Sequence, residues 1–429
     1  MVKITGMKPI AYYITAHGYG HGTRSCDVLR ALHRLAPDQP VIVTTDLPRD
    51  FLNSRLAGCF ADNAAISHTC ASVENRAGGI TLRRGAFDVG LVQKDSIRSD
   101  LFQTLEKLEI LYARDEVRIA DERRFFKAEE VGLVVADIPA IPLIAAQRAR
   151  IPNIAIGNFS WDWIYEAYAK TDFHWEYFVE KFRTAYEKTD LLLRLPFAPP
   201  MEVFPNRKDI PLLASPGTER RKEIRDSGFE IREPTHPGLR PPLPRRGTYK
   251  TPSAGGVPGR RGGSDDVSQY DICTKKTWVL LSFTSLDLNF QALEKIRELS
   301  NDYEFFCVEP LRYDGSCIHS IDRKAISFAD ILASCDIVIS KPGFGLISEC
   351  IVNNKPLIYS DRSDFAEYPY LVEGIEKYLK NIHIPSEQLY AGDFFQALEK
   401  IKTAPEPEQS LESGGADRIA DELIRSVGR

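Results

Sequence analysis

The stretch "PIAYYITAHGYGHGTR", residues 9–24, joins a continuous apolar run to a turn with three glycines and two histidines. The run predicts a buried strand, because strands covered on both faces of a parallel sheet are unbroken apolar segments. The glycines leave the backbone open to a ligand, and imidazoles titrate near neutral pH. These residues are Gly18, Gly20, Gly22, His17 and His21. The turn is compatible with a phosphate cradle, a dinucleotide fingerprint, a metal site or a simple tight turn.

A second strand-to-helix turn, "CDIVISKPGFGLISE" at residues 335–349, repeats this arrangement. Gly343 and Gly345 expose backbone N–H groups at the start of a helix, where the helix dipole favours an anion. Ser348 could add a hydroxyl to a phosphate oxygen. Glu349 suits the two hydroxyls of a ribose, or it interacts with the helix dipole from the first turn of the helix.

Strand and helix patterns alternate twice along the chain, which predicts two doubly wound, Rossmann-like α/β domains facing a cleft. The first is expected over residues 1–205 and the second, smaller one over 276–404. Residues 206–275 form a linker. Within it, residues 230–264 are rich in Pro, Gly and Arg and predict disorder, because they hold too few apolar residues to fold. Residues 405–429 form a tail with a C-terminal helix.

The composition is that of a globular protein of 429 residues with a net charge of -5. This charge argues against a general nucleic-acid or membrane-surface role, which would favour a basic excess. No apolar run reaches the roughly 20 residues of a transmembrane helix. The eight cysteines are scattered without a CxxC pair, which favours a reducing, cytoplasmic location.

Two features of the first turn separate the alternatives. Its G-x-G-x-G spacing departs from the dinucleotide fingerprint, although Asp46 ends the next strand where an acid would bind ribose. A zinc site would need carboxylate or thiolate partners that no nearby motif supplies for His17 and His21. A histidine at a helix start beside a cleft suits a general base, or it hydrogen-bonds to backbone.

The two turns, in this order on two domains, resemble those of the GT-B glycosyltransferases, including the peptidoglycan N-acetylglucosaminyltransferase and UDP-glycosyltransferase groups. Gly20-His21 matches the Gly-His that ends the N-terminal turn of these enzymes. A closer resemblance, over most of residues 8–205 and 275–400, is to the glycosyltransferase-like N-terminal half of L-arabinokinase. Three of the stretches that carry it are "YYITAHGYGHGTR", "WVLLSF" and "CDIVISKPGFGLISECIVNNKPLIYSDRSDFAEYPYL".

This resemblance implies a metal-independent, inverting glycosyltransferase that uses a nucleotide-sugar, expected to be UDP-linked, as donor substrate and needs no cofactor. His21 would deprotonate a hydroxyl of the acceptor. Thr284 and Ser285 match a second phosphate-contacting loop, Arg362 would neutralise the diphosphate, and Glu367 would contact the donor sugar. The expected donor-site residues are Gly18, Gly20, Gly22, Thr284, Ser285, Gly343, Phe344, Gly345, Ser348, Glu349, Arg362 and Glu367.

The segment "NFSWDWIYEAY", residues 158–168, is unusually rich in aromatic residues. Trp161 or Trp163 could stack on a sugar, and Asp162 could orient His21 or a hydroxyl as a second catalytic residue. Alternatively, the segment is the buried start of a helix that packs on the sheet. Three charged residues that could border the acceptor, or be solvated loop charges, are Arg83, Arg84 and Asp88.

Three other functions remain compatible with these motifs. A non-catalytic nucleotide-sugar-binding protein would keep the second turn and need no base. A nucleotide-sugar epimerase would use the same two domains without an acceptor. An NAD(P)-dependent oxidoreductase would use the first turn together with Asp46.

Overall fold

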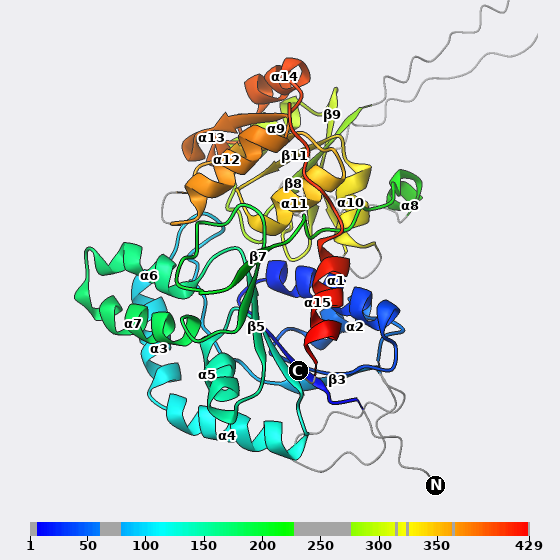
Figure 1. The fold of residues 1–429 in the computed structure, drawn as a ribbon. Helices are drawn as coiled ribbons and strands as arrows, with labels where there is room; N and C mark the ends of the chain where they lie inside the picture. The colour runs from blue at the N-terminus through cyan, green and yellow to red at the C-terminus, as the bar shows by residue number, and fades with distance from the viewer. Residues whose placement is uncertain are drawn as a thin grey trace, which may run out of the picture.

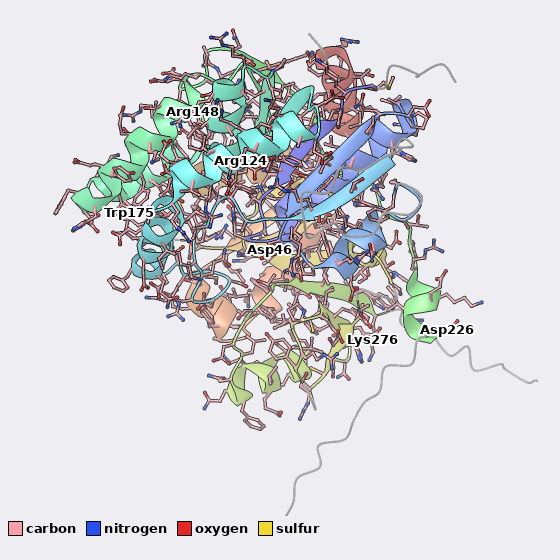
Figure 2. The ribbon with its side chains drawn as sticks, turned by 90° about the horizontal axis from the view of Figure 1, so that it is seen from below. Asp46, Arg124, Arg148, Trp175, Asp226 and Lys276 are labelled. Carbon is pink, nitrogen blue, oxygen red and sulfur yellow. The ribbon has the colours of Figure 1, made fainter. Side chains whose placement is uncertain are left out.

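The computed structural model of the chain describes residues 7–60, 79–226, 276–313, 316–322, 326–362 and 365–427. The segment predicted to be disordered, residues 230–264, lies outside the described residues. Figure 2 labels Asp226 and Lys276, where the description stops and resumes. The described residues form two α/β domains, one above the other in Figure 1.

The first domain is built on a sheet of seven strands that pair in parallel. They are β1 (Ile10–Ile14), β2 (Pro40–Thr45), β3 (Gly79–Arg84), β4 (Leu133–Asp137), β5 (Asn153–Gly157), β6 (Leu191–Arg194) and β7 (Arg207–Asp209). Their order is β3-β2-β1-β4-β5-β6-β7. Because β1 lies between β2 and β4, the direction of winding reverses there, and such a switch point opens a crevice at the carboxyl ends of the strands.

Helices cover both faces of this sheet. They are α1 (Tyr19–Leu35), α2 (Arg49–Arg55), α3 (Leu101–Tyr112), α4 (Asp115–Ala128), α5 (Ala140–Ala149), α6 (Trp161–Ala169), the 3₁₀ turn η1 (Phe173–Trp175) and α7 (Glu176–Tyr186). Alternate strand residues face opposite sides, so Tyr13 packs with the group α3 to α7, and Tyr12 packs with α1 and α2. This two-sided burial explains why the strands are continuous apolar runs.

The second domain repeats the pattern on a sheet of six parallel strands. The strands are β8 (Thr277–Ser282), β9 (Tyr303–Val308), β10 (Ile318–Ile321), β11 (Ile337–Ser340), β12 (Leu357–Ser360) and β13 (Asn381–Ile384). The helices are α8 (Arg221–Asp226), α9 (Phe290–Glu298), α10 (Phe328–Ser334), α11 (Phe344–Val352), α12 (Tyr368–Tyr378), α13 (Ser386–Tyr390) and α14 (Phe395–Thr403). The strand order β10-β9-β8-β11-β12-β13 places a second switch point between β8 and β11. The predicted pair of doubly wound domains is confirmed.

The chain crosses between the domains at two places. Strand β7 extends the first sheet just beyond residue 205, and α8 then packs on the second domain through Ile224. After α14 the chain returns, and α15 (Gly415–Ser426) packs against α1, as Figure 1 shows. The two crossings are hydrogen-bonded: the Leu212 N–H donates to Glu412 O (2.8 Å), and the Gly415 N–H donates to Leu212 O (3.1 Å).

Within the described part of the chain, no helix is both long and apolar enough to cross a membrane.

Candidate functional site between the two domains

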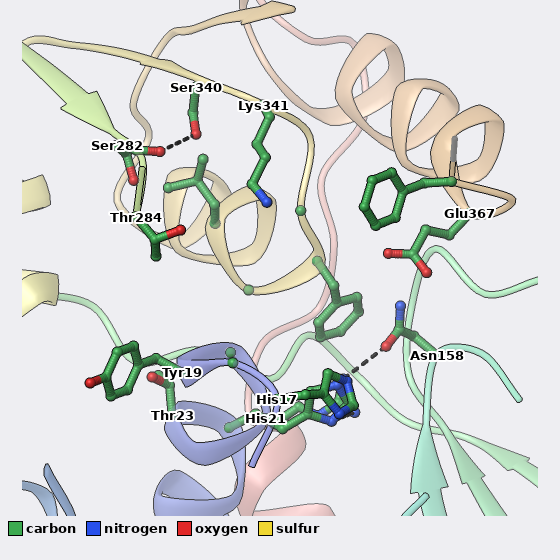
Figure 3. A pocket seen from close by; sticks show the side chains of 18 of the residues that line it. His17, Tyr19, His21, Thr23, Asn158, Ser282, Thr284, Ser340, Lys341 and Glu367 are labelled. Atoms are coloured by element: carbon green, nitrogen blue, oxygen red, sulfur yellow. Dashed lines mark hydrogen bonds between the residues drawn. The ribbon is translucent and has the colours of Figure 1, made fainter. Parts of the chain in front are cut away.

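A cavity of about 430 Å³ lies between the two domains, at the carboxyl ends of both sheets. Its walls come from the segments after β1, β5, β8 and β11, which include both switch points. Figure 3 shows His17 and His21 on one side of this cavity and Lys341, Thr284 and Glu367 on the other. The two glycine-rich turns that the sequence singles out therefore meet in one site.

The first turn differs from the expected open loop, because α1 begins at Tyr19 and contains most of the motif. Gly18 caps the helix, and a Cβ on Gly18 or Gly20 would meet no atom within 4 Å, so a ligand can reach the backbone there. Gly22 has another role, because a Cβ there would lie 2.7 Å from Leu47 and Phe51. It allows α1 to pack closely and does not line the cavity.

His21 contacts a buried carboxylate from a distant part of the chain. Its Nδ1 lies 2.9 Å from Oδ1 of Asp137, the last residue of β4. The register of the sheet creates this contact, because Ile14 at the end of β1 pairs with Asp137. The chain runs from Ile14 directly into the turn that carries His21, which is 12% exposed towards the cavity.

Asp137 is the centre of a buried hydrogen-bond network. Its Oδ2 accepts hydrogen bonds from Arg24 Nε and Ser25 Oγ, both at 2.9 Å, and its Oδ1 also accepts from Arg24 Nη2. Burial alone would raise the pKa of Asp137, but the Arg24 cation and the hydrogen bonds from Arg24 and His21 outweigh it and hold this pKa well below its usual range. Asp137 is therefore ionised at neutral pH.

The same surroundings act in the opposite direction on His21. Burial and the Arg24 cation lower the pKa of His21 to about 4, although the Asp137 carboxylate acts to raise it. His21 is therefore neutral at physiological pH. Arg24 Nη2 also lies 2.8 Å from His21 Nδ1, so this ring nitrogen is within hydrogen-bond distance of both Arg24 and Asp137.

His17 packs between His21 and Trp161. The centroid of the His17 ring lies 4.8 Å from that of His21 and 5.2 Å from that of Trp161. Gly90, which has φ of 68°, lies against the His17 ring so closely that a Cβ there would be 2.1 Å from Cγ. His17 also lines the cavity, and its Nδ1 is buried without a hydrogen-bond partner among the described residues.

The second domain contributes two basic side chains to the cavity, Lys341 and Arg362. Burial, together with the Arg362 charge, lowers the pKa of Lys341 well below its usual range. Burial also lowers the pKa of Arg362 to about 10, even though Glu367 lies 3.7 Å from the guanidinium. An anion in the cavity would stabilise both charged forms.

Helix α11 directs its N-terminus into the cavity beside these basic side chains, and Gly343, Phe344 and Gly345 line the wall. A Cβ on Gly343 would meet no atom within 4 Å, and one on Gly345 would lie 3.8 Å from Gly20 Cα. The N-terminal turns of α1 and α11 thus pack against each other through Gly20 and Gly345. Exposed N–H groups at two helix N-termini favour an anion.

Two predicted ligands on α11 are placed further along the helix than expected. Ser348 and Glu349 lie in the second turn and not in the first, because α11 begins at Phe344. The Ser348 hydroxyl is buried and donates to Phe344 O at 2.9 Å, so it does not line the cavity. Glu349 is only 6% exposed and does line the cavity.

The loop after β8 brings one of its two predicted residues to the cavity. Thr284 lines it, whereas Ser285 does not. The Ser285 N–H donates to Ser96 Oγ of the first domain at 3.0 Å. A phosphate contact at the Ser285 N–H would have to displace that bond.

The structure does not bring Asp162 to His21; the carboxylate in that place is Asp137. Asp162 and Trp163 line a separate cavity near α7. Burial raises the pKa of Asp162, which forms part of the buried start of α6. Trp161 lines the cleft cavity, and Tyr165 stacks on it at 5.3 Å.

Arg83 and Arg84 pair outside the cavity, whereas Asp88 Oδ2 lies 3.8 Å from Nδ1 of His17, which lines it. Arg83 forms two hydrogen bonds with Glu122, at 2.7 and 2.6 Å. Arg84 binds Asp46 at 2.8 Å on the surface, where Figure 2 labels Asp46, so the acid considered for a dinucleotide ribose lies away from the cleft. Asp88 accepts a hydrogen bond from Thr15.

Sequence reasoning missed Asp137, Arg24 and Lys341. Asp137 ends the apolar run "LVVAD", and a polar residue at the carboxyl end of a parallel strand was the available signal. Lys341 lies inside the quoted second turn, directly after β11. Among the described residues, no group of three or more His, Cys, Asp or Glu side chains is placed to hold a metal ion.

Comparison with solved structures identifies the two-domain arrangement as the GT-B fold. UGT89C1 of Arabidopsis thaliana, solved in complex with quercetin, has a TM-score of 0.54 at 12% identity, covering 99% of this chain and 100% of that one. The calicheamicin glycosyltransferase CalG4 has a TM-score of 0.53 at 14% identity, with 99% of both chains covered.

A curated relative matches in sequence. L-arabinokinase of Arabidopsis thaliana is 25% identical over 430 residues, which is 98% of this chain and 34% of the relative. The chain thus spans about a third of the length of the relative that it matches. No family model matches the chain.

Proposed function

We propose that the protein is a glycosyltransferase that moves a sugar, with inversion, from a UDP-linked nucleotide-sugar to a hydroxyl group, without a metal ion. The observation that carries this proposal is the position of the His21–Asp137 pair. It faces, across one cavity, the N-terminus of α11 with Lys341 and Arg362. A proton acceptor thus lies opposite a site for a departing anion.

The second domain would hold the nucleotide. Its diphosphate would lie at Gly343 and Gly345, where the backbone is open, and the charges of Lys341 and Arg362 would balance it. Glu349 would accept hydrogen bonds from the ribose hydroxyls. These are the roles of a metal-independent donor site, in which cations and a helix dipole stabilise the leaving group.

The first domain would supply the base. With Nδ1–H bonded to Asp137, His21 Nε2 takes the proton from the acceptor hydroxyl. The acceptor oxygen then bonds to the anomeric carbon as the bond from that carbon to the diphosphate oxygen breaks. The electron pair leaves with the diphosphate, and attack on the face opposite the leaving group inverts the anomeric centre.

The relatives support the reaction class. CalG4 is described as a glycosyltransferase, and UGT89C1 was solved in complex with quercetin. The relative L-arabinokinase is about three times as long as this chain, so the proposal does not include the activity of that whole protein.

A panel of UDP, GDP and dTDP, with and without attached sugars, tests the donor site by thermal shift. UDP-sugars are expected to raise Tm, and Glu349→Gln to weaken binding about tenfold to a hundredfold, because one charged acceptor of the ribose is lost. Glu373→Ala, on the exposed surface of α12, is the matched control. A Tm that no nucleotide changes would contradict the proposal, and binding without turnover would indicate a non-catalytic binding protein.

The pH profile of kcat/KM tests the protonation state of His21. Only the neutral imidazole accepts a proton, and its pKa is lowered to about 4 from 6.5. Activity should therefore persist as the pH falls through 6.5 and decline only near pH 4, provided that circular dichroism shows the protein to be folded. An acid limb at the ordinary histidine value would contradict the lowered pKa of His21 in the active protein.

A further inference from the structure

Residues 93–99 of the first domain form a self-contained turn between the cleft and α3. Gln93 and Ser99 form an antiparallel bridge, and the Lys94 N–H donates to Arg98 O at 2.9 Å. The Asp95 carboxylate accepts from the N–H groups of Ile97 (2.8 Å) and Arg98 (2.9 Å). Such local side-chain bonds fix a turn before it meets another surface.

The tip of this turn is buried in the second domain. Ile97 is 3% exposed and belongs to the apolar core around Leu281 and Phe283, on one face of the second sheet. The Tyr390 hydroxyl of α13 donates to Asp95 at 3.2 Å. A first-domain residue thus completes a second-domain core, which favours a fixed closed arrangement of the two domains.

Ser96 connects this turn to the cavity. It is 1% exposed, its Oγ accepts the Ser285 N–H at 3.0 Å, and it lies 3.2 Å from Thr284 Oγ1. Thr284 lines the cavity, and so do Leu91, just before the turn, and Gln93, its first residue. One segment therefore contacts the acceptor side and the donor side of the site.

We propose that residues 94–98, the tip of this turn, act as an interdomain plug, with Ile97 as its anchor and Ser96 as the residue that positions the Thr284 hydroxyl for the nucleotide-sugar. This rests on the proposed function for the role of Thr284. The plug keeps the loop after β8, which holds Thr284 and Ser285, in one conformation. Loss of the plug therefore weakens donor binding and leaves the proton transfer at His21 unchanged. Ser96 does not touch the reacting atoms; it acts through Thr284.

Donor binding by variants tests this role. Ser96→Ala is expected to raise the Kd for UDP and the donor KM about tenfold, with kcat within about twofold, because the buried hydrogen bonds to Thr284 and Ser285 are lost. Ser99→Ala, which removes a buried hydroxyl of the same turn that has no described hydrogen-bond partner, is the matched control and should leave both values unchanged. Thr284→Val should match Ser96→Ala, and the double variant should lose no more than either single one. Fully additive losses, or an unchanged Kd in Ser96→Ala, would overturn the proposal.

Hydrogen exchange gives a readout that needs no nucleotide. Exchange in the segment 283–288 should become faster in Ser96→Ala and Ile97→Ala, and stay at the wild-type rate in Ser99→Ala. Wild-type exchange in all three variants would refute the plug. If wild-type protein binds no nucleotide while these exchange differences appear, the proposed function fails and the plug stands.

Discussion

Replacing His21 with glutamine should lower kcat for release of the nucleotide diphosphate about 10²–10⁴-fold, the usual contribution of a general base. The amide cannot take the acceptor proton, whereas donor binding depends on groups across the cavity, so the Tm shift with nucleotide should persist. The measurement is steady-state turnover with the donor that the nucleotide panel selects.

The matched control is His33→Gln, in the last turn of the same helix, which should keep wild-type kcat. A kcat for His21→Gln within about twofold of wild type would exclude the base role. The tautomer can be checked separately by ¹⁵N NMR of His21, which should carry its proton on Nδ1.

Replacing Asp137 with asparagine should lower the free energy of unfolding by about 3–5 kcal/mol, the cost of removing one partner of a buried ion pair. Arg24 is 5% exposed, and without the carboxylate its charge would be buried with no counter-charge among its described contacts. Urea unfolding followed by tryptophan fluorescence measures the change.

The comparison for this variant is Asp46→Asn, which breaks the exposed pair with Arg84 and should cost no more than about 1 kcal/mol. Equal losses in the two variants would show that the Asp137 network contributes little to stability. Asp137→Asn should also lose turnover, because an amide can hold the imidazole in the wrong tautomer.

Local patterns predicted the two domains and placed both glycine-rich segments after strands, because apolar runs and glycine placement act within a few residues, although most of the first segment lies in α1. Glu349 was a candidate from its own turn, and the family resemblance added Arg362 and Glu367; the structure brings all three to one cavity with His21.

The rest of the site depends on long-range contacts. Asp137 meets His21 only because β4 pairs with β1, across 116 residues, and no local spacing encodes that pairing. Asp162 was one candidate partner of His21, yet it lines another cavity. Ser285 matched a phosphate-contacting loop, but its N–H donates to Ser96 of the other domain, a contact that no local pattern encodes.

The two crossings of the chain restrict how the domains can move. Leu212 and Glu412 connect the crossings side by side, so the domains are joined at two adjacent segments and not at one. Ile97 of the first domain, which is buried in the core of the second, adds a third connection. These connections favour one closed geometry of the cleft, with Gly345 against Gly20.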